Sequence, residues 1–149
     1  MFAPKNILVP TDFSKYSDAA LREALDIAIR YEAKIYLLHV ITEHIQQCGE
    51  DYCLSDEVVD QFDKESLKGA MDKLEKEAER IAKNKAVKIS FDIKRGVAHE
   101  VILNEQEARK IDLIVISSHG KTGILKYLMG SVADRVIKGA KCPIIVIKP

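Results

Sequence analysis

Short apolar segments alternate with segments of helical periodicity along the whole chain, and this alternation restricts the possible folds more than any other feature of the sequence. Five segments rich in Ile, Val and Leu have the length and composition of β-strands: Lys5–Pro10, Lys34–Val40, Val87–Ile93, Asp112–Ile116 and Pro143–Ile147. Three of them are nearly continuous apolar runs, which favours strands buried on both faces of a parallel sheet. Val87–Ile93 alternates instead, so we expect it at a more exposed edge.

The segments between these strands carry apolar residues at helical spacing. They are Ser17–Arg30, Glu65–Lys83, Glu100–Arg109 and Ser131–Lys138. We expect Ser17 to cap the first helix and Gly139 to end the last one. Strands and helices that alternate from end to end predict one α/β domain over residues 1–149, built on a parallel sheet.

The composition fits a soluble globular domain and excludes several classes of function. The chain has 23 Lys and Arg against 23 Asp and Glu, so we expect neither nucleic-acid nor membrane-surface binding. No apolar run reaches the roughly 18–20 residues of a membrane span, and Met1–Lys5 does not resemble a signal peptide. Cys48, Cys53 and Cys142 are too few for a disulfide framework and fit a reducing cytoplasm.

The segment Ile41–Phe62 is acidic and contains neither Lys nor Arg. We interpret it as a solvated loop that leads into the long helix, with a lid or partner-binding role as the alternative. Cys48 and Cys53 lie within it. Because no second Cys or His pair completes a zinc site, free thiols are favoured over a regulatory disulfide.

The connections around the first strand indicate where a ligand would bind. Crossovers between parallel strands are right-handed, and in common five-stranded arrangements successive connections leave the first strand in opposite directions. Such sheets bind ligands outside the carboxyl ends of the strands at this switch point. The candidate site therefore consists of the segments after the first and fourth strands, Pro10–Ser14 and Ser117–Ser131.

The loop after the fourth strand has the composition of an anion site. Gly120, Gly123 and Gly130 lie between a buried strand and a helix expected to begin near Ser131. Glycine allows backbone N–H groups to approach a phosphate closely, and a helix N-terminus supplies further N–H donors. An ordinary glycine turn with Ser131 as N-cap is the alternative. The loop is not a P-loop, because Val115 stands where that motif has its first glycine.

Individual side chains near the strand ends have two interpretations each. Asp12 could bind a ribose, an amine or a divalent cation, or it could form an Asx-turn or cap the following helix. Val40 could flank a flat ring or belong to the core. His119 has no neighbouring nucleophile, which favours a ligand contact or a loop-forming role over a general base. His39 lies inside an apolar strand, so we expect it to be partly buried and hydrogen-bonded.

The sequence resembles the universal stress protein family from its first strand to its last. Ile7–Ser14 is similar to the opening strand and turn of that family, Leu37–Val40 to its second strand and Cys142–Ile147 to its closing strand. The resemblance implies a five-stranded parallel sheet in the order 3-2-1-4-5. It also implies a homodimer formed through the last strand, Pro143–Ile147.

A motif of the ATP-binding members, G-x2-G-x9-G-S/T, is matched at its last three positions by Gly120, Gly130 and Ser131. Its first position is Ser117 here. The match implies a site for ATP with Mg²⁺ or Mn²⁺, in which Asp12 and Val40 hold the ribose and adenine. The ribose and phosphates would be surrounded by Ser117, Gly120, Gly130, Ser131 and Val132. With the strand-end residues included, the candidate site is Pro10, Thr11, Asp12, Val40, Ser117, His119, Gly120, Gly130, Ser131 and Val132.

Three functions fit such a chain. The favoured one is a cytoplasmic regulatory protein that binds ATP and whose nucleotide-bound state is recognised by a partner. An enzyme of related architecture that cleaves ATP or adenylates with it lacks support, because the sequence contains no S-G-G-x-D-S loop, no H-I-G-H and no base beside a nucleophile. Slow ATP hydrolysis stays open as an alternative, since a metal ion and N–H donors near the phosphates would give some electrostatic stabilisation. A nucleotide-free interaction module of the same fold is favoured by Ser117, and it would act through its dimer surface or the acidic segment.

Overall fold

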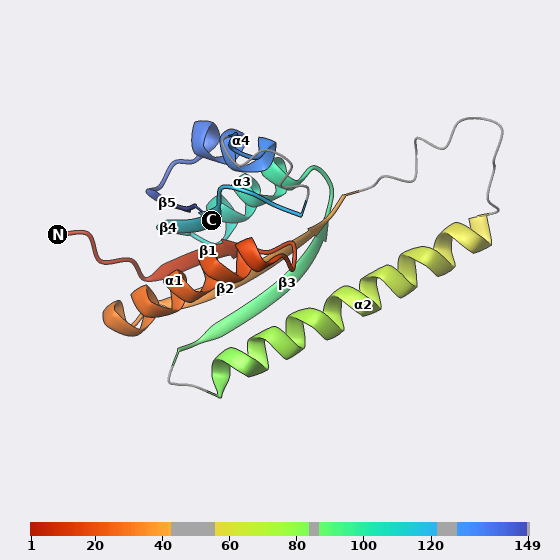
Figure 1. Cartoon of the computed structure of the whole chain (residues 1–149), viewed down its shortest axis with the longest axis horizontal. Helices are drawn as coiled ribbons and strands as arrows, with labels where there is room; N and C mark the ends of the chain where they lie inside the picture. Colours follow the sequence, from red (N-terminus) through yellow and green to blue (C-terminus); the bar gives the residue numbers. More distant parts are fainter. Residues whose placement is uncertain (43–55, 84–86, 122–127, 149) are drawn as a thin grey trace.

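The computed structural model describes residues 1–42, 56–83, 87–121 and 128–148. Within these ranges a parallel sheet has the strand order β3-β2-β1-β4-β5 (Figure 1). The strands are β1 Asn6–Pro10, β2 Lys34–Ile41, β3 Ile89–Arg95, β4 Leu113–Ser117 and β5 Ile144–Ile147. The helices are α1 Lys15–Tyr31, α2 Asp56–Ala82, α3 Ala98–Ala108 and α4 Ser131–Gly139. The predicted α/β class and the order 3-2-1-4-5 are confirmed, with every strand end within two residues of its expected position.

Both faces of the sheet are covered, because successive residues of a strand point to opposite sides. Ile7 and Val9 of β1 are fully buried in a core that includes residues of α1 and α2. Leu8 lies between them in sequence and is buried in a second core with residues of α3 and α4. Burial on both faces is the physical reason why the central strands are continuous apolar runs.

The strand β3 lies at one edge of the sheet, as its alternating sequence predicts. Phe91 and Ile93 are half-buried and pack against the core on the side of α1 and α2, whereas Ser90 is exposed. At the opposite edge, every residue of β5 is half-buried. No helix in the described part of the chain is both long enough and apolar enough to cross a membrane.

The first helix is capped by Ser14 and not by Ser17, which corrects the expectation. The Ser14 side chain accepts a hydrogen bond from the Ser17 N–H at 3.2 Å. The Ser17 hydroxyl is buried, donates to the Ser14 carbonyl at 3.0 Å and lies 3.2 Å from the Thr11 hydroxyl. The helix begins before its apolar stripe does, so the periodicity alone placed the cap one turn too late.

The long helix α2 begins at Asp56 and not at Glu65, so the loop expected over Ile41–Phe62 is wrong from Asp56 onward. Acidic residues are favourable in the first turns of a helix because they interact with its positive end. A charge-rich composition therefore fits a helix start as well as a solvated loop. Cys48 and Cys53 lie outside the described residues.

The short helix α4 ends at Gly139, as expected, and its C-cap is Ala140. A Cβ at Gly139 would lie 2.6 Å from Cδ1 of Leu103 on α3. The glycine therefore allows close packing between α3 and α4. At the other end of the helix, the N-cap is Gly130 rather than Ser131, and no side chain caps the helix.

Candidate functional site

One cavity of about 350 Å³ lies at the carboxyl ends of the strands and brings together every predicted site residue. We call it the central cavity. Its position is the switch point of the sheet, since β2 and β4 flank β1 on opposite sides. The predicted residues that line it are Pro10, Thr11, Asp12, Val40, Ser117, His119, Gly120, Gly130, Ser131 and Val132.

One wall of the central cavity is apolar and consists of residues that were not predicted from the sequence. Leu38 of β2 and Ile102 of α3 are almost completely buried, and Ile116 of β4 is 4% exposed. Ala98 lies one helical turn before Ile102 and lines the same wall. The signal was present in the sequence: Leu38 and Ile116 lie on the strand face that Leu8 shares. The cavity therefore has one apolar end suited to a flat ring.

The turn after β1 is held by the side chains of its own residues. Thr11 Oγ1 accepts a hydrogen bond from the Phe13 N–H at 3.1 Å, and Asp12 Oδ1 accepts one from the Ser14 N–H at 3.0 Å. Phe13 lies between these bonds with a φ of 63°, a left-handed conformation that is unusual for a bulky residue. The two side-chain bonds stabilise this turn, so the Asx-turn interpretation of Asp12 is confirmed.

The second carboxylate oxygen of Asp12 joins this turn to the loop after β4. Asp12 Oδ2 accepts a hydrogen bond from the Lys121 N–H at 2.9 Å. Burial disfavours the charged form of Asp12, but the hydrogen bonds from Ser14 and Lys121 outweigh it and lower the pKa of the carboxyl group. A Cβ at Gly120 would lie 2.8 Å from the same oxygen, so only glycine fits there without a shift.

The start of α4 folds back onto the end of β4. The Gly130 N–H donates to the Ser118 carbonyl at 2.7 Å, and a Cβ at Gly130 would lie 3.2 Å from that carbonyl oxygen. Ser131 is exposed, and Ser131, Val132 and Ala133 of the first turn all line the central cavity. The first-turn N–H groups of a helix have no partner within the helix and carry its positive partial charge. This polar end of the cavity is suited to an anion.

Ser117 and His119 shape the loop after β4 with their own side chains. The Ser117 hydroxyl donates to the His119 carbonyl at 2.7 Å, and His119 Nδ1 lies 2.7 Å from the Ser118 hydroxyl. The hydroxyl that replaces the first motif glycine is thus used within the loop. His119 combines a loop hydrogen bond with a place on the cavity wall.

His39 lies beside the site and has the partly buried, hydrogen-bonded environment expected of it. Its Nδ1 lies 2.8 Å from the Thr11 carbonyl, and its ring centroid is 4.5 Å from that of Phe13. Burial lowers the pKa of His39, and the positive charges of Lys121 and Lys73 act in the same direction. Through this hydrogen bond and ring contact, His39 supports the turn after β1.

The described residues include no group of three or more His, Cys, Asp or Glu side chains placed to hold a metal ion. Asp12 is the only carboxylate among the described residues that line the central cavity, and both of its oxygens already accept backbone hydrogen bonds. A divalent cation here would need most of its oxygen ligands from another source, such as the phosphates of a ligand.

The fold and the central cavity define an open α/β protein with a ligand cavity at the switch point of its parallel sheet. Residues 4–148 match the model of the universal stress protein family. The chain belongs to this family.

Individual relatives agree with this assignment. Universal stress protein MJ0531 of Methanocaldococcus jannaschii is 37% identical over 146 residues, which cover 97% of this chain and 82% of the relative. Among solved structures, universal stress protein UspA from Lactobacillus plantarum has a TM-score of 0.81 at 28% identity, with 97% of each chain covered. The protein MJ0577 has a TM-score of 0.78 at 30% identity, with 99% of this chain and 98% of that chain covered.

Two more distant structures are described as nucleotide complexes. A universal stress protein in complex with cAMP is 20% identical with a TM-score of 0.72 and covers 99% of this chain and 98% of its own. One from Archaeoglobus fulgidus in complex with dAMP is 21% identical with a TM-score of 0.59 and covers 99% and 100%. For this chain, these two likenesses show the fold alone.

Proposed function

We propose that this protein binds ATP in the central cavity and acts as a nucleotide-dependent regulatory protein in the stress response. The observation that carries the proposal is the polarity of the cavity, with an apolar wall at one end and the start of α4 at the other. The adenine would lie against Val40 and the wall that includes Leu38 and Ile102. The adenine nucleotides named for two solved structures of the same fold support this ligand class.

The phosphates would lie at the polar end. Gly120 and Gly130 leave no side chain between the ligand and the backbone, and Ser117, Ser131 and Val132 would surround the ribose and phosphates. The first-turn N–H groups of α4 would donate to phosphate oxygens. Mg²⁺ or Mn²⁺ would be held by the phosphates themselves, and Asp12 would contact the ribose or lie beside the cation.

The proposed assembly is a homodimer formed through Pro143–Ile147. The strand β5 ends the sheet in the described structure, and its residues are all half-buried. A partner strand would cover its open edge. A cytoplasmic location is proposed with this assembly, because the low cysteine content fits a reducing compartment.

Two other functions remain as alternatives to ATP-dependent regulation. Slow ATP hydrolysis is the first, since N–H donors and a bound cation would stabilise charge on the phosphates. A nucleotide-free interaction module is the second, and Ser117 in place of the motif glycine is the feature that favours it. The Ser117 hydroxyl donates to the His119 carbonyl and not into the cavity, which weakens that argument.

The proposal is tested by the ligand that the native protein carries. The protein is purified without added nucleotide, denatured, and the released small molecules are identified by mass spectrometry. Isothermal titration calorimetry with ATP and Mg²⁺ then measures the affinity of the emptied protein. We expect an adenine nucleotide in the extract and a saturable site of about one ATP per chain. Absence of both would leave the nucleotide-free module as the function.

A further inference from the structure

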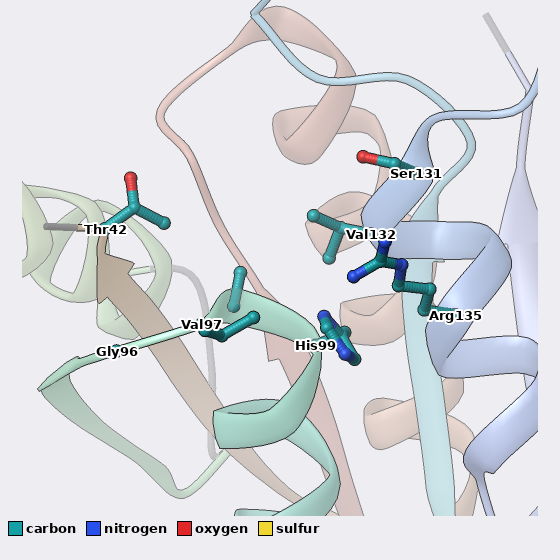
Figure 2. Close-up of a pocket in the computed structure, with 8 residues that line it drawn as sticks. Thr42, Gly96, Val97, His99, Ser131, Val132 and Arg135 are labelled. Atoms are coloured by element: carbon teal, nitrogen blue, oxygen red, sulfur yellow. The ribbon is translucent and has the colours of Figure 1, made fainter. Parts of the chain in front are cut away.

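A second cavity of about 410 Å³ adjoins the central one between the starts of α3 and α4 (Figure 2). We call it the outer cavity. Thr42, Ala98, Ser131 and Val132 line both cavities, so the two are continuous at the first turn of α4. The residues that line the outer cavity alone are Gly96, Val97, His99 and Arg135. The proposed function assigns no role to any of these four.

Among the described residues that line the outer cavity, the ionisable side chains are those of Arg135 and His99. Figure 2 shows them projecting from α4 and α3 into the hollow between the helices. Arg135 is exposed and forms no ion pair with any described residue, although its neighbour Asp134 is paired with Lys138 at 2.8 Å. His99 Nε2 lies 4.0 Å from an oxygen of Glu100, which is beyond hydrogen-bond distance. The described residues of the lining therefore offer hydrogen-bond donors and no carboxylate.

The spacing along α4 relates Arg135 to the proposed phosphate site. Ser131 and Arg135 are four residues apart, which places them on the same face of a helix, about one turn from each other. Ser131 lines both cavities and Arg135 lines the outer one. A phosphate chain that begins at the first turn of α4 would reach the guanidinium group as it leaves the central cavity. A guanidinium group is well suited to a terminal phosphate because it donates two parallel hydrogen bonds.

We propose that the outer cavity is the subsite for the terminal phosphate of a nucleoside triphosphate, with Arg135 as the main donor and His99 as the second. The inference rests on the proposed function, since it takes the nucleoside to be bound in the central cavity. It adds a specificity: the site distinguishes a triphosphate from a monophosphate through Arg135. Both residues bind the ligand, and no chemical step is assigned to either.

The experiment compares ATP with AMP by isothermal titration calorimetry for the full chain and its Arg135→Ala variant. Arg135→Ala is expected to weaken ATP binding about tenfold, the value of one charge-assisted pair, and to leave AMP binding unchanged. Arg135→Lys, which keeps the charge but loses the two-pronged geometry, is expected to lie between wild type and alanine. His99→Ala is expected to weaken ATP binding to a smaller extent, also without an effect on AMP.

Lys138→Ala is the matched control, because Lys138 is a cation on the same helix, is exposed, and lies outside both linings. It should change neither affinity. If Arg135→Ala lost the same affinity for ATP as for AMP, or lost affinity for neither, the proposed subsite would be wrong. The proposal that the protein binds ATP would still stand. A wild-type protein that binds ATP no more tightly than AMP would overturn the subsite in the same way. A wild-type protein that binds neither nucleotide would overturn the proposed function as well.

Discussion

The N–H of Lys121 donates to the carboxylate of Asp12 at 2.9 Å, although the two residues are 109 positions apart in the chain. This bond joins the turn after β1 to the loop after β4 across the switch point of the sheet. The same carboxylate closes its own turn through the Ser14 N–H at 3.0 Å. Asp12 therefore fixes the shape of the central cavity whether or not it also contacts a ligand.

Replacement of Gly120 by alanine should abolish ATP binding without unfolding the protein. The new methyl carbon would lie 2.8 Å from Asp12 Oδ2, so the carboxylate or the loop must move. We expect the increase in melting temperature that ATP produces in the wild type to be lost. Thermal unfolding with and without ATP measures it.

Gly69→Ala is the control for this substitution, because nothing lies within 4 Å of a Cβ at that position of α2. Alanine in a helix interior should raise the free energy of unfolding by about 0.5–1 kcal/mol and leave the ATP effect intact. An ATP-induced shift in Gly120→Ala equal to that of the wild type would contradict the proposed role of this glycine.

Asp12→Ala should destabilise the protein by about 1–2 kcal/mol at neutral pH and remove the effect of ATP. The folded-state pKa of Asp12 is lowered, mainly by hydrogen bonds that overcome the effect of burial. A lowered pKa means that the carboxylate stabilises the fold above the ordinary pKa of 3.8 and that this contribution is lost as the pH falls through the folded-state pKa. Chemical denaturation from pH 3 to pH 7, at roughly unit steps, should show a shallower pH dependence for the variant. An unchanged slope would show that Asp12 is not held in this way.

Ser117→Gly restores the first glycine of the family motif and tests whether serine weakens ATP binding. The Ser117 hydroxyl donates to the His119 carbonyl at 2.7 Å, so its removal should mainly loosen the loop. We expect the ATP affinity to change by less than about threefold and the free energy of unfolding to fall by about 1 kcal/mol. Calorimetry and urea denaturation measure the two quantities. A gain in affinity of about a hundredfold or more would mean that serine obstructs the phosphates and would favour the nucleotide-free alternative.

The position of the site could be predicted because it depends on topology. In a parallel sheet the carboxyl ends of β1 and β4 meet at one edge, so residues that follow these strands lie together whatever their side chains are. Asp12, Gly120 and Ser131 follow from this rule. The hydrogen bond between Asp12 and Lys121 does not follow from it, since it depends on how two loops pack. The apolar wall at Ile102 depends likewise on how α3 packs against the sheet.

The errors lie where local patterns carry two meanings. The acidic residues before Glu65 fit a solvated loop as well as a helix start, and the structure has a helix there from Asp56. Ser14 and Ser17 are both possible caps, and the tight turn after β1 selects Ser14. In each case the local sequence is compatible with two structures, and tertiary packing determines which of them forms.

We expect Glu77 on α2 to make the stability of the fold depend on pH. Its side chain is 8% exposed, and its Oε1 has no hydrogen-bond partner among the described residues, with Arg80 Nη2 3.9 Å away. Burial and the neighbouring Asp18 carboxyl raise the pKa of Glu77 from 4.5 to about 7, and Arg80 offsets only part of this. Because the folded-state pKa is raised, the protonated Glu77 side chain contributes its full stabilisation of the fold below pH 4.5. This contribution is lost as the pH rises through about 7.

Glu77→Gln keeps the shape of the side chain and removes its charge, so the variant should lose this pH dependence. At a pH of about 8 we expect its free energy of unfolding to exceed that of the wild type by about 1–2 kcal/mol, and near pH 4.5 we expect the two to agree. Glu79→Gln is the control, because Glu79 is exposed on the same helix. Urea denaturation across this pH range measures the difference. The prediction fails if Glu77→Gln and Glu79→Gln both give the same pH profile as the wild type. The Glu77 carboxylate would then be charged and solvated in the folded protein, and its interaction with Asp18 would not respond to pH.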